Sequence, residues 1–332
     1  IREYSRAHQR RSNTMKLRNM YETAYRAGIA ADPRGRDGVA RVLERAKKAF
    51  ADMPESRRWE FDQETLVNPY ADTRILVGDP DTEVSKILVG IDLEVGEVLL
   101  ADALRTRGTT IDLMLAHHPE GRALARLEEV MALQADVWHK FGVSLAYGDA
   151  VMSDRMKEIM RALHPRNNEQ TIAAARLLDL SYMCCHTPAD NNVNKFVQAR
   201  CDDLGEDATV DELLDMLKEI PEYREAVLQG TGPVIFEGEG TRRTGKIMVD
   251  MTGGTSGPVD SINKLAEAGL GTIVGMHMGE EHRKRAKDMH MNVVIAGHIC
   301  SDSLGMNLII DHFEREGVDV VACSGFTRVS RA

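Results

Sequence analysis

The chain has 332 residues, 43% hydrophobic and 28% charged, a balance typical of a soluble globular protein with a substantial core. Its net charge of −10 argues against a general nucleic-acid binder, because a phosphate backbone needs a basic surface. No apolar run reaches the roughly 18–20 residues that cross a bilayer, no signal-peptide pattern is present, and five cysteines argue against a disulfide framework. We therefore expect a cytoplasmic protein that does not contact membranes.

The N-terminal part of the chain is predicted to be helical. Residues 1–14 are polar and basic, and we expect them to be a poorly ordered lead. Between residues 15 and 52, apolar side chains recur at spacings of three and four, which predicts helices, with a turn at residues 32–35. We assign residues 1–60 to a helical extension that packs on the rest of the chain or forms an oligomer contact.

Residues 61–200 are predicted to form a first α/β lobe. Short apolar strands alternate with helices, and the fully apolar strand at 111–116 is typical of a sheet that is covered on both faces. Helical stripes near 121–165 indicate an insertion, in which methionines fill a core or an interface. The strands of this lobe are expected at residues 74–78, 86–92, 111–116 and 182–186.

Residues 201–332 repeat this rhythm and are predicted to form a second α/β lobe. Two short helices separated at Pro221 come first, and strands then alternate with helices to the end of the chain. The similar rhythm indicates that the two lobes are related. The strands of the second lobe are expected at residues 246–251, 272–277, 293–298 and 318–322.

Histidines stand at the ends of three apolar runs. One run ends in two adjacent histidines, and each of the other two has an aspartate four residues after its histidine. Ligands collect at the carboxyl ends of strands in α/β sheets, and imidazole with carboxylate suits zinc, iron, manganese, cobalt or nickel. Pro119 ends the first strand, so both of its histidines can face one site. The candidate residues are His117, His118, His186, Asp190, His298 and Asp302.

Each of these residues also has a purely structural interpretation. Asp190 and Asp302 precede predicted helices, where aspartate commonly caps the N-terminus. Cys184 and Cys185 beside His186 are interpreted as buried, inert thiols, because no Cys-x-x-Cys spacing is present. The matching pattern at three strand ends nevertheless favours a metal site over caps and core residues alone.

Two further segments carry candidate functional residues. The loop at 253–258 joins a strand to a helix, and its backbone N–H groups are suited to a phosphate or carboxylate, although a tight structural turn explains it equally well. His282 follows two acids at a helix start and is a candidate for proton transfer; the acids themselves also complement a helix N-terminus. The residues proposed for an anionic group are Gly253, Gly254, Thr255 and Ser256.

Taken together, the motifs resemble the Nif-three-like family, whose members often carry the label of type 2 GTP cyclohydrolase I homologues. The resemblance covers residues 69–120, 180–200 and 246–325, most of the predicted core. Any one motif alone is weak, but the set is specific. The motifs are Val77-Gly78-Asp79, Val89-Gly90-Ile91-Asp92, Ala116-His117-His118-Pro119, His186-Thr187-Pro188-Ala189-Asp190 with Asn194, and Ala296-Gly297-His298 with Asp302.

The resemblance implies a three-layer α/β fold of two related lobes, with a dinuclear metal site between them and assembly into a ring-shaped hexamer. Asp302 departs from the family pattern, because the last ligand is normally glutamate, which is one methylene longer. Residues 15–60 and 121–165 are helical additions to the compact family form. The ligands that the resemblance implies are His117, His118, Asp190, His298 and Asp302, with His186 adjacent.

The function expected from these observations is that of a metal-dependent hydrolase with two divalent transition-metal ions. Its substrate would be small and nucleotide-like or anionic, and His186 or His282 would transfer protons. One alternative is a non-catalytic metal-binding or regulatory protein that acts through its homo-oligomer or a partner, because open and closed coordination shells use the same residue types. Another is a nucleotide-binding α/β protein whose histidines are incidental.

Overall fold

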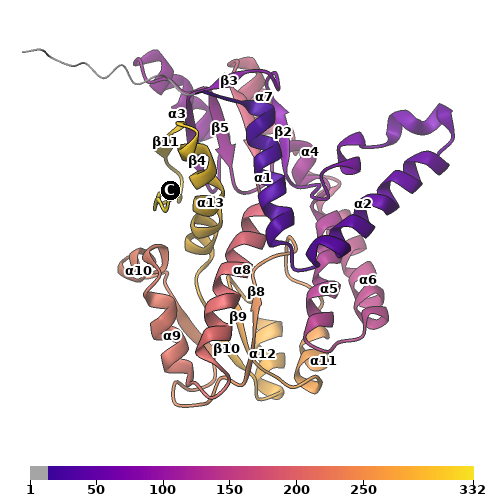
Figure 1. Cartoon of the computed structure of the whole chain (residues 1–332), viewed down its shortest axis with the longest axis vertical. Helices are drawn as coiled ribbons and strands as arrows, with labels where there is room; N and C mark the ends of the chain where they lie inside the picture. The colour runs from indigo at the N-terminus through magenta and orange to yellow at the C-terminus, as the bar shows by residue number, and fades with distance from the viewer. Residues whose placement is uncertain (1–13) are drawn as a thin grey trace, which may run out of the picture.

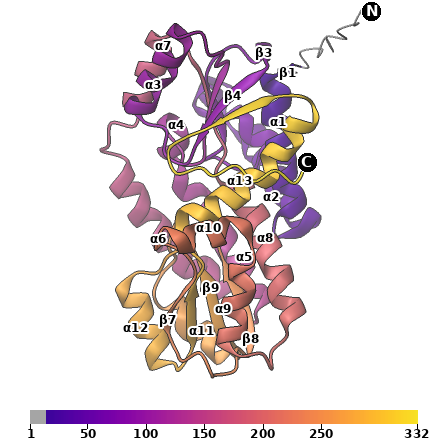
Figure 2. The ribbon, with the colours of Figure 1, turned by 90° about the vertical axis from the view of Figure 1, so that its left-hand side faces the viewer.

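The computed structural model describes residues 14–332, so the expectation of a poorly ordered lead falls on residues 1–13, outside this part of the chain. Two main sheets lie toward opposite ends of the long axis (Figure 1), and α8 (Thr187–Leu204) and α13 (His298–Arg315) run between them in both views (Figure 2). The fold is mixed α/β, as predicted. None of the helices in residues 14–332 is long and apolar enough to cross a membrane.

The first sheet has the strand order β11-β4-β5-β6-β2. Its first four strands are parallel, and β2 runs antiparallel to β6 at one edge. A separate two-residue ribbon, β1 (Met15–Lys16) with β3 (Glu83–Val84), lies outside it. The strands of the first sheet are β2 (Arg74–Val77), β4 (Lys86–Gly90), β5 (Leu113–Ala116), β6 (Ser181–Cys184) and β11 (Asp319–Ala322).

Helices cover both faces of this sheet because successive strand residues point to opposite sides. Leu88, Met114 and Tyr182 belong to one buried cluster, and Ile87 and Leu113 belong to the cluster on the other face. The first cluster is closed by α3 and α7, and the second by α1 and α13. The predicted three-layer arrangement is therefore confirmed. The helices, apart from α13, are α1 (Leu17–Ala31), α3 (Val95–Thr106) and α7 (Gln170–Leu177).

The second sheet repeats this plan with the order β7-β10-β9-β8. Three strands are parallel, and β7, which was not predicted, runs antiparallel at the edge. Helices α8, α9, α10 and α13 cover one face; α11, α12 and the insertion cover the other. The elements are α9 (Val210–Lys218), α10 (Pro221–Leu228), β7 (Val234–Glu237), β8 (Lys246–Asp250), α11 (Ser261–Glu267), β9 (Leu270–Gly275), α12 (Glu280–Asp288) and β10 (Asn292–Ile295).

The last strand does not join the sheet that precedes it in the chain. Within the stretch 201–332, β11 pairs in parallel with β4 of the first sheet, after α13 has crossed from one sheet to the other. The periodicity of apolar residues identifies a strand but does not show which strand it pairs with. The prediction therefore assigned the last strand to the second lobe, with the strands that precede it in the chain. The division into the ranges 1–60, 61–200 and 201–332 stays a prediction.

The two helical additions are tied to each other and to both sheets. In the insertion, Met131, Trp138 and Met152 pack into the buried cluster on one face of the second sheet. Asp62, two residues after the N-terminal extension, accepts hydrogen bonds from buried Arg74, at 3.0 Å, and from Arg126 of the insertion, at 2.7 Å. The additional helices are α2 (Gly35–Asp52), η1 (Glu55–Glu60), η2 (Gln63–Leu66), α4 (Gly121–Leu124), η3 (Leu127–Ala132), α5 (Leu133–Lys140) and α6 (Leu145–Leu163).

Helices α8 and α13 begin earlier than the sequence predicted. They start at Thr187 and His298, whereas starts near residues 193 and 304 were expected. Asp190 therefore lies inside the first turn of α8 and Asp302 just after the first turn of α13, and neither helix has a side-chain cap. The interpretation of the two aspartates as N-caps is wrong, and their carboxylates are available for another role.

Candidate metal centre

The three predicted segments converge between the two sheets. His117 and His118 follow β5, and the ring of His117 lies 4.8 Å from that of His186, which follows β6 in the same sheet. His298 opens α13 after β10 of the second sheet, and its ring lies 5.4 Å from that of His118. Parallel strands bring their carboxyl ends to one edge, and helices α8 and α13 add Asp190 and Asp302 to that edge.

Three of the imidazoles are oriented by partners on their Nδ1 atoms. His117 donates to the backbone carbonyl of Cys185 at 3.1 Å. His118 donates to Asp92 at 2.6 Å, and His186 donates to buried Asp72 at 2.8 Å. A hydrogen on Nδ1 leaves the lone pair of a neutral imidazole on Nε2, the arrangement that metal-binding histidines require.

The Nε2 atoms face two buried carboxylates. Asp302 Oδ1 lies 3.4 Å from His117 Nε2, and Asp302 Oδ2 lies 3.5 Å from His118 Nε2 and 3.6 Å from His298 Nε2. Asp190 Oδ1 lies 3.4 Å from His117 Nε2, and Asp190 Oδ2 lies 3.7 Å from His186 Nε2. Asp302 thus presents one oxygen to each side of the cluster.

Several of these buried atoms have no hydrogen-bond partner among residues 14–332. They are His117 Nε2, Asp190 Oδ1 and both carboxylate oxygens of Asp302. A buried polar group left without a partner costs about 1–3 kcal/mol, and a metal ion at the centre of the cluster would satisfy these atoms. Three groups of ligand atoms are close enough to hold an ion: His117 with His118 and His186, His118 with His298 and Asp302, and His117 with Asp190 and Asp302.

The pKa shifts of the clustered residues also indicate a site that favours positive charge. Burial alone would raise the pKa of Asp302, but His117 and His118 outweigh it and hold that pKa well below its usual range. Burial lowers the pKa of His118, yet Asp302 and Asp92 together raise it to about 10. The pKa of Asp190 is raised well above its ordinary value by burial.

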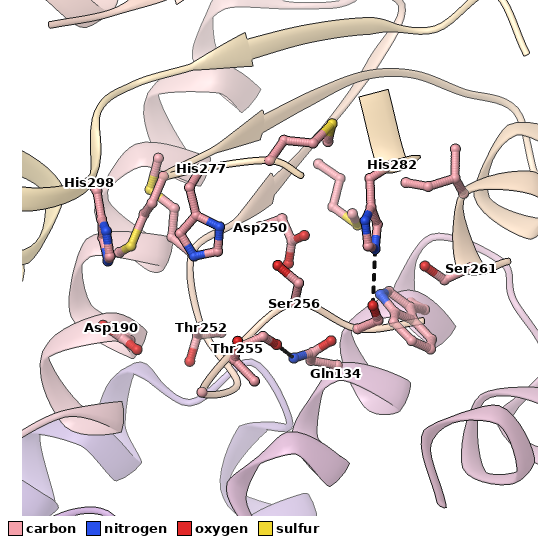
Figure 3. Close-up of a pocket in the computed structure, with 18 of the residues that line it drawn as sticks. Gln134, Asp190, Asp250, Thr252, Thr255, Ser256, Ser261, His277, His282 and His298 are labelled. Carbon is pink, nitrogen blue, oxygen red and sulfur yellow. Dashed lines mark hydrogen bonds between the residues drawn. The ribbon is translucent and has the colours of Figure 1, made fainter. Parts of the chain in front are cut away.

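A cavity leads away from this cluster along the carboxyl edge of the second sheet. His298 and Asp190 lie toward one end, His282 and Ser261 toward the other, and Thr255 and Ser256 between them (Figure 3); Asp302 also lines the cavity. Side chains of the insertion fix the 253–258 loop by hydrogen bonds. Gln134 donates to the carbonyls of Gly253 at 2.7 Å and Thr255 at 2.6 Å. Arg155 donates to the carbonyl of Ser256 at 3.1 Å. Of the four residues proposed for an anionic group, Gly254, Thr255 and Ser256 line the cavity, and Gly253 precedes them in the same loop.

The two residues predicted to transfer protons occupy different places. His186 lies inside the histidine cluster, and its Nδ1 is bound to Asp72. His282 is at the far end of the cavity, where its Nε2 donates to the carbonyl of Gly257 at 3.0 Å. Cys184 and Cys185 are buried free thiols, as predicted, and burial raises the pKa of Cys184 to about 12.

Sequence reasoning missed residues that support or extend the cluster. Asp92, Asp250 and His277 each follow an apolar strand, so the rule that singled out His298 would also have found them. Asp72 lies in a loop before β2, and Gln134 lies within the insertion. No local pattern marks either of these two, because their partners are more than a hundred residues away in the chain.

Comparison with known proteins adds to this geometry. Neither protein-family models nor curated proteins match the sequence. A NIF3 superfamily protein from Sphaerobacter thermophilus has a similar structure, with 25% sequence identity and a TM-score of 0.67. The match covers 86% of this chain and 98% of that one. The chain is therefore similar to a NIF3 superfamily protein over most of its length.

Other solved structures are similar to this NIF3-like chain at lower identity. HcgD from Methanocaldococcus jannaschii is 14% identical, with a TM-score of 0.45, over 85% of this chain and 96% of that one. A Bacillus cereus protein related to NIF3 is 12% identical, with a TM-score of 0.40, over 84% and 96% of the two chains. The resemblance stated from the motifs is supported by the similarity to the Sphaerobacter thermophilus protein.

Proposed function

We propose that this NIF3-like chain is a hydrolase that depends on two divalent transition-metal ions, from among zinc, iron, manganese, cobalt and nickel. The observation that carries the proposal is the buried set of ligand atoms without partners around Asp302. His117, Asp190 and Asp302 would hold one ion, with His186 beside them. His118, His298 and Asp302 would hold the other.

The donor set suits such ions and leaves one side of the centre open. Imidazole nitrogens and carboxylate oxygens are typical ligands for these metals. Asp302 is 1% exposed, but the side chain of His298 is 41% exposed and lines the cavity. When bound, two such ions polarise the bond to be cleaved and make water a better nucleophile. An approach route beside His298 favours a catalytic centre over a closed structural one.

Other residues of the chain would bind substrate and move protons. Proton transfer is proposed for His186 and His282, and the structure adds His277, whose exposed ring lies 5.0 Å from that of His298. The loop residues Gly253, Gly254, Thr255 and Ser256 are proposed to bind an anionic group of a small substrate. The carbonyls at 253, 255 and 256 accept hydrogen bonds from Gln134 and Arg155, and Thr255 N–H donates to the Gly253 carbonyl, so the N–H groups of Gly253, Gly254 and Ser256 are those proposed for the anion.

A non-catalytic metal-binding or regulatory role through a homo-oligomer is the second candidate. Exposed apolar side chains on α10, β7 and the start of α13 favour an oligomer contact close to the metal centre. A hexamer is the assembly proposed from the family resemblance. The side chains in question are Leu228, Val234, Phe236 and Ile299.

Metal content tests the proposal directly. Protein purified without chelator should hold about two transition-metal ions per chain by mass spectrometry of the elements. His118→Ala should lose metal while remaining folded, and His164→Ala, an exposed histidine on the C-terminal side of α6, should retain the wild-type content. Finding no metal, with no binding on titration, would overturn the proposal. An unfolded His118→Ala chain would indicate a structural role for His118.

Water relaxation separates the two candidate functions. When the protein is loaded with Mn²⁺, an exchangeable water on the ion increases the relaxation rate of bulk water protons. A large increase is expected for a hydrolase, because a catalytic site keeps a coordination position open. A relaxation rate no higher than that of a fully enclosed ion would favour the regulatory role.

A further inference from the structure

A second polar cluster lies in the same cavity, next to the proposed metal ligand His298, and its centre is Asp250. This residue ends β8, and the cavity is lined by its carboxylate together with His277 and His282. Figure 3 shows Asp250 between the two imidazoles and above Ser256. None of the groups of ligand atoms that could hold an ion in residues 14–332 includes these three side chains.

Asp250 has no partner that explains its position. Its side chain is exposed to the cavity, and no residue from 14 to 332 donates a hydrogen bond to it. Burial raises the pKa of Asp250, and the nearby His277 and His282 offset only part of that rise. A carboxylate with a raised pKa and no hydrogen-bond donor reduces the stability of the folded protein. A ligand that donates hydrogen bonds to it would offset that cost.

The cavity around Asp250 carries no compensating cation. Lysine and arginine are absent from its lining within the described part of the chain. Part of the wall is apolar, with a tryptophan and several methionines, which suit a flat group. These apolar residues include Trp138, Met248, Met251, Ile262, Met276 and Met278.

We propose that Asp250 forms a subsite for a planar, positively charged nitrogen group of the substrate, of the amidinium or guanidinium type. Two N–H donors of such a group match the two oxygens of a carboxylate, and charge-assisted bonds of this kind are stronger than neutral ones. His277 and His282 flank the subsite, and the apolar walls hold the flat remainder of the molecule. The inference rests on the proposed function only in placing the other end of the same substrate at the metal centre.

Three probes of the same size and shape test the subsite. Benzamidine is a planar cation, benzamide is its neutral counterpart, and benzoate is the anion. Binding of each is measured by calorimetry or by ligand-detected NMR on the protein as purified. We expect benzamidine to bind most tightly and to bind at least about tenfold more weakly to Asp250→Asn. Benzoate should bind to Asp250→Asn as well as or better than to the wild type.

A matched substitution controls for a general loss of charge. Asp215→Asn removes an exposed carboxylate from α9, outside the cavity, and should leave benzamidine binding unchanged. Thermal unfolding checks that each variant folds, and Asp250→Ala replaces Asp250→Asn if the latter does not. Benzamidine that fails to bind the wild type, or that binds the wild type and the Asp250 variant equally, overturns the proposal.

The metal content of every sample keeps this test separate from that of the proposed function. A chain without metal whose benzamidine affinity still depends on Asp250 would overturn the proposed function and leave the subsite standing. A chain with two metal ions whose benzamidine affinity is the same with and without the Asp250 carboxylate would overturn the subsite alone.

Discussion

The two ends of the cavity differ in how far hydrogen bonds fix their polar side chains. At the metal end, three imidazoles have their Nδ1 atoms bound to Cys185, Asp92 and Asp72, and the acids between them are buried. At the other end, Asp250 and His277 face the cavity without such partners. The comparison shows a rigid site suited to ions of fixed geometry next to an adaptable one suited to an organic group.

The difference follows from which elements build each end. The metal end takes side chains from both sheets and from two long helices, so that packing on all sides restricts their movement. The other end takes its polar groups from one sheet edge and from α12, and the insertion supports its loop through Gln134. Substitutions at the two ends should therefore have different consequences.

The largest effect is expected at the metal end, from Asp302→Asn. Asp302 supplies one oxygen to each of two candidate ligand groups, so the substitution should weaken binding of both ions by more than about a hundredfold. Elemental analysis and competition with a chelator dye measure this, with Asp215→Asn as the control. Retention of both ions by the folded variant would show that Asp302 is not shared between them.

A smaller effect is expected from Asp72→Asn, which changes an orienting residue and not a proposed ligand. Asp72 accepts hydrogen bonds from His186 and from the Thr187 hydroxyl, at 2.8 and 2.6 Å. The substitution should lower metal affinity by about 10–100-fold, with the fold retained. Metal titration followed by circular dichroism measures both. Wild-type affinity would mean that the position of His186 does not depend on this carboxylate.

The smallest effect is expected at the other end, where Asp250→Asn should stabilise the protein. Because the pKa of Asp250 is raised in the folded state, that state holds its proton more tightly than the unfolded chain does, and stability falls as pH rises above about 4. The variant should melt roughly 1–2 °C higher than the wild type at pH 7, since water still reaches the site. The gain should vanish near pH 4. Thermal unfolding with chelator present at both pH values measures it, and a lower melting temperature at pH 7 would contradict the assignment.

Much of the candidate site was predictable because its residues obey a local rule. His117, His118, His186 and His298 end apolar runs, and strands of a parallel sheet end at one edge. The same rule would have found Asp250 and His277 but was not applied to them. Asp72 and Gln134 could not be found in this way, since their roles depend on partners distant in the chain.

The sequence by itself determined the alternation of strands and helices, the strand-end histidines and the family to which they point, because these depend on side-chain periodicity and on residue spacing. The tertiary structure decided which sheet received β11, where α8 and α13 began, and which carboxylates remained without partners. Those outcomes depend on packing between distant segments: the early starts of the two helices turned Asp190 and Asp302 from expected caps into buried acids that face the imidazoles.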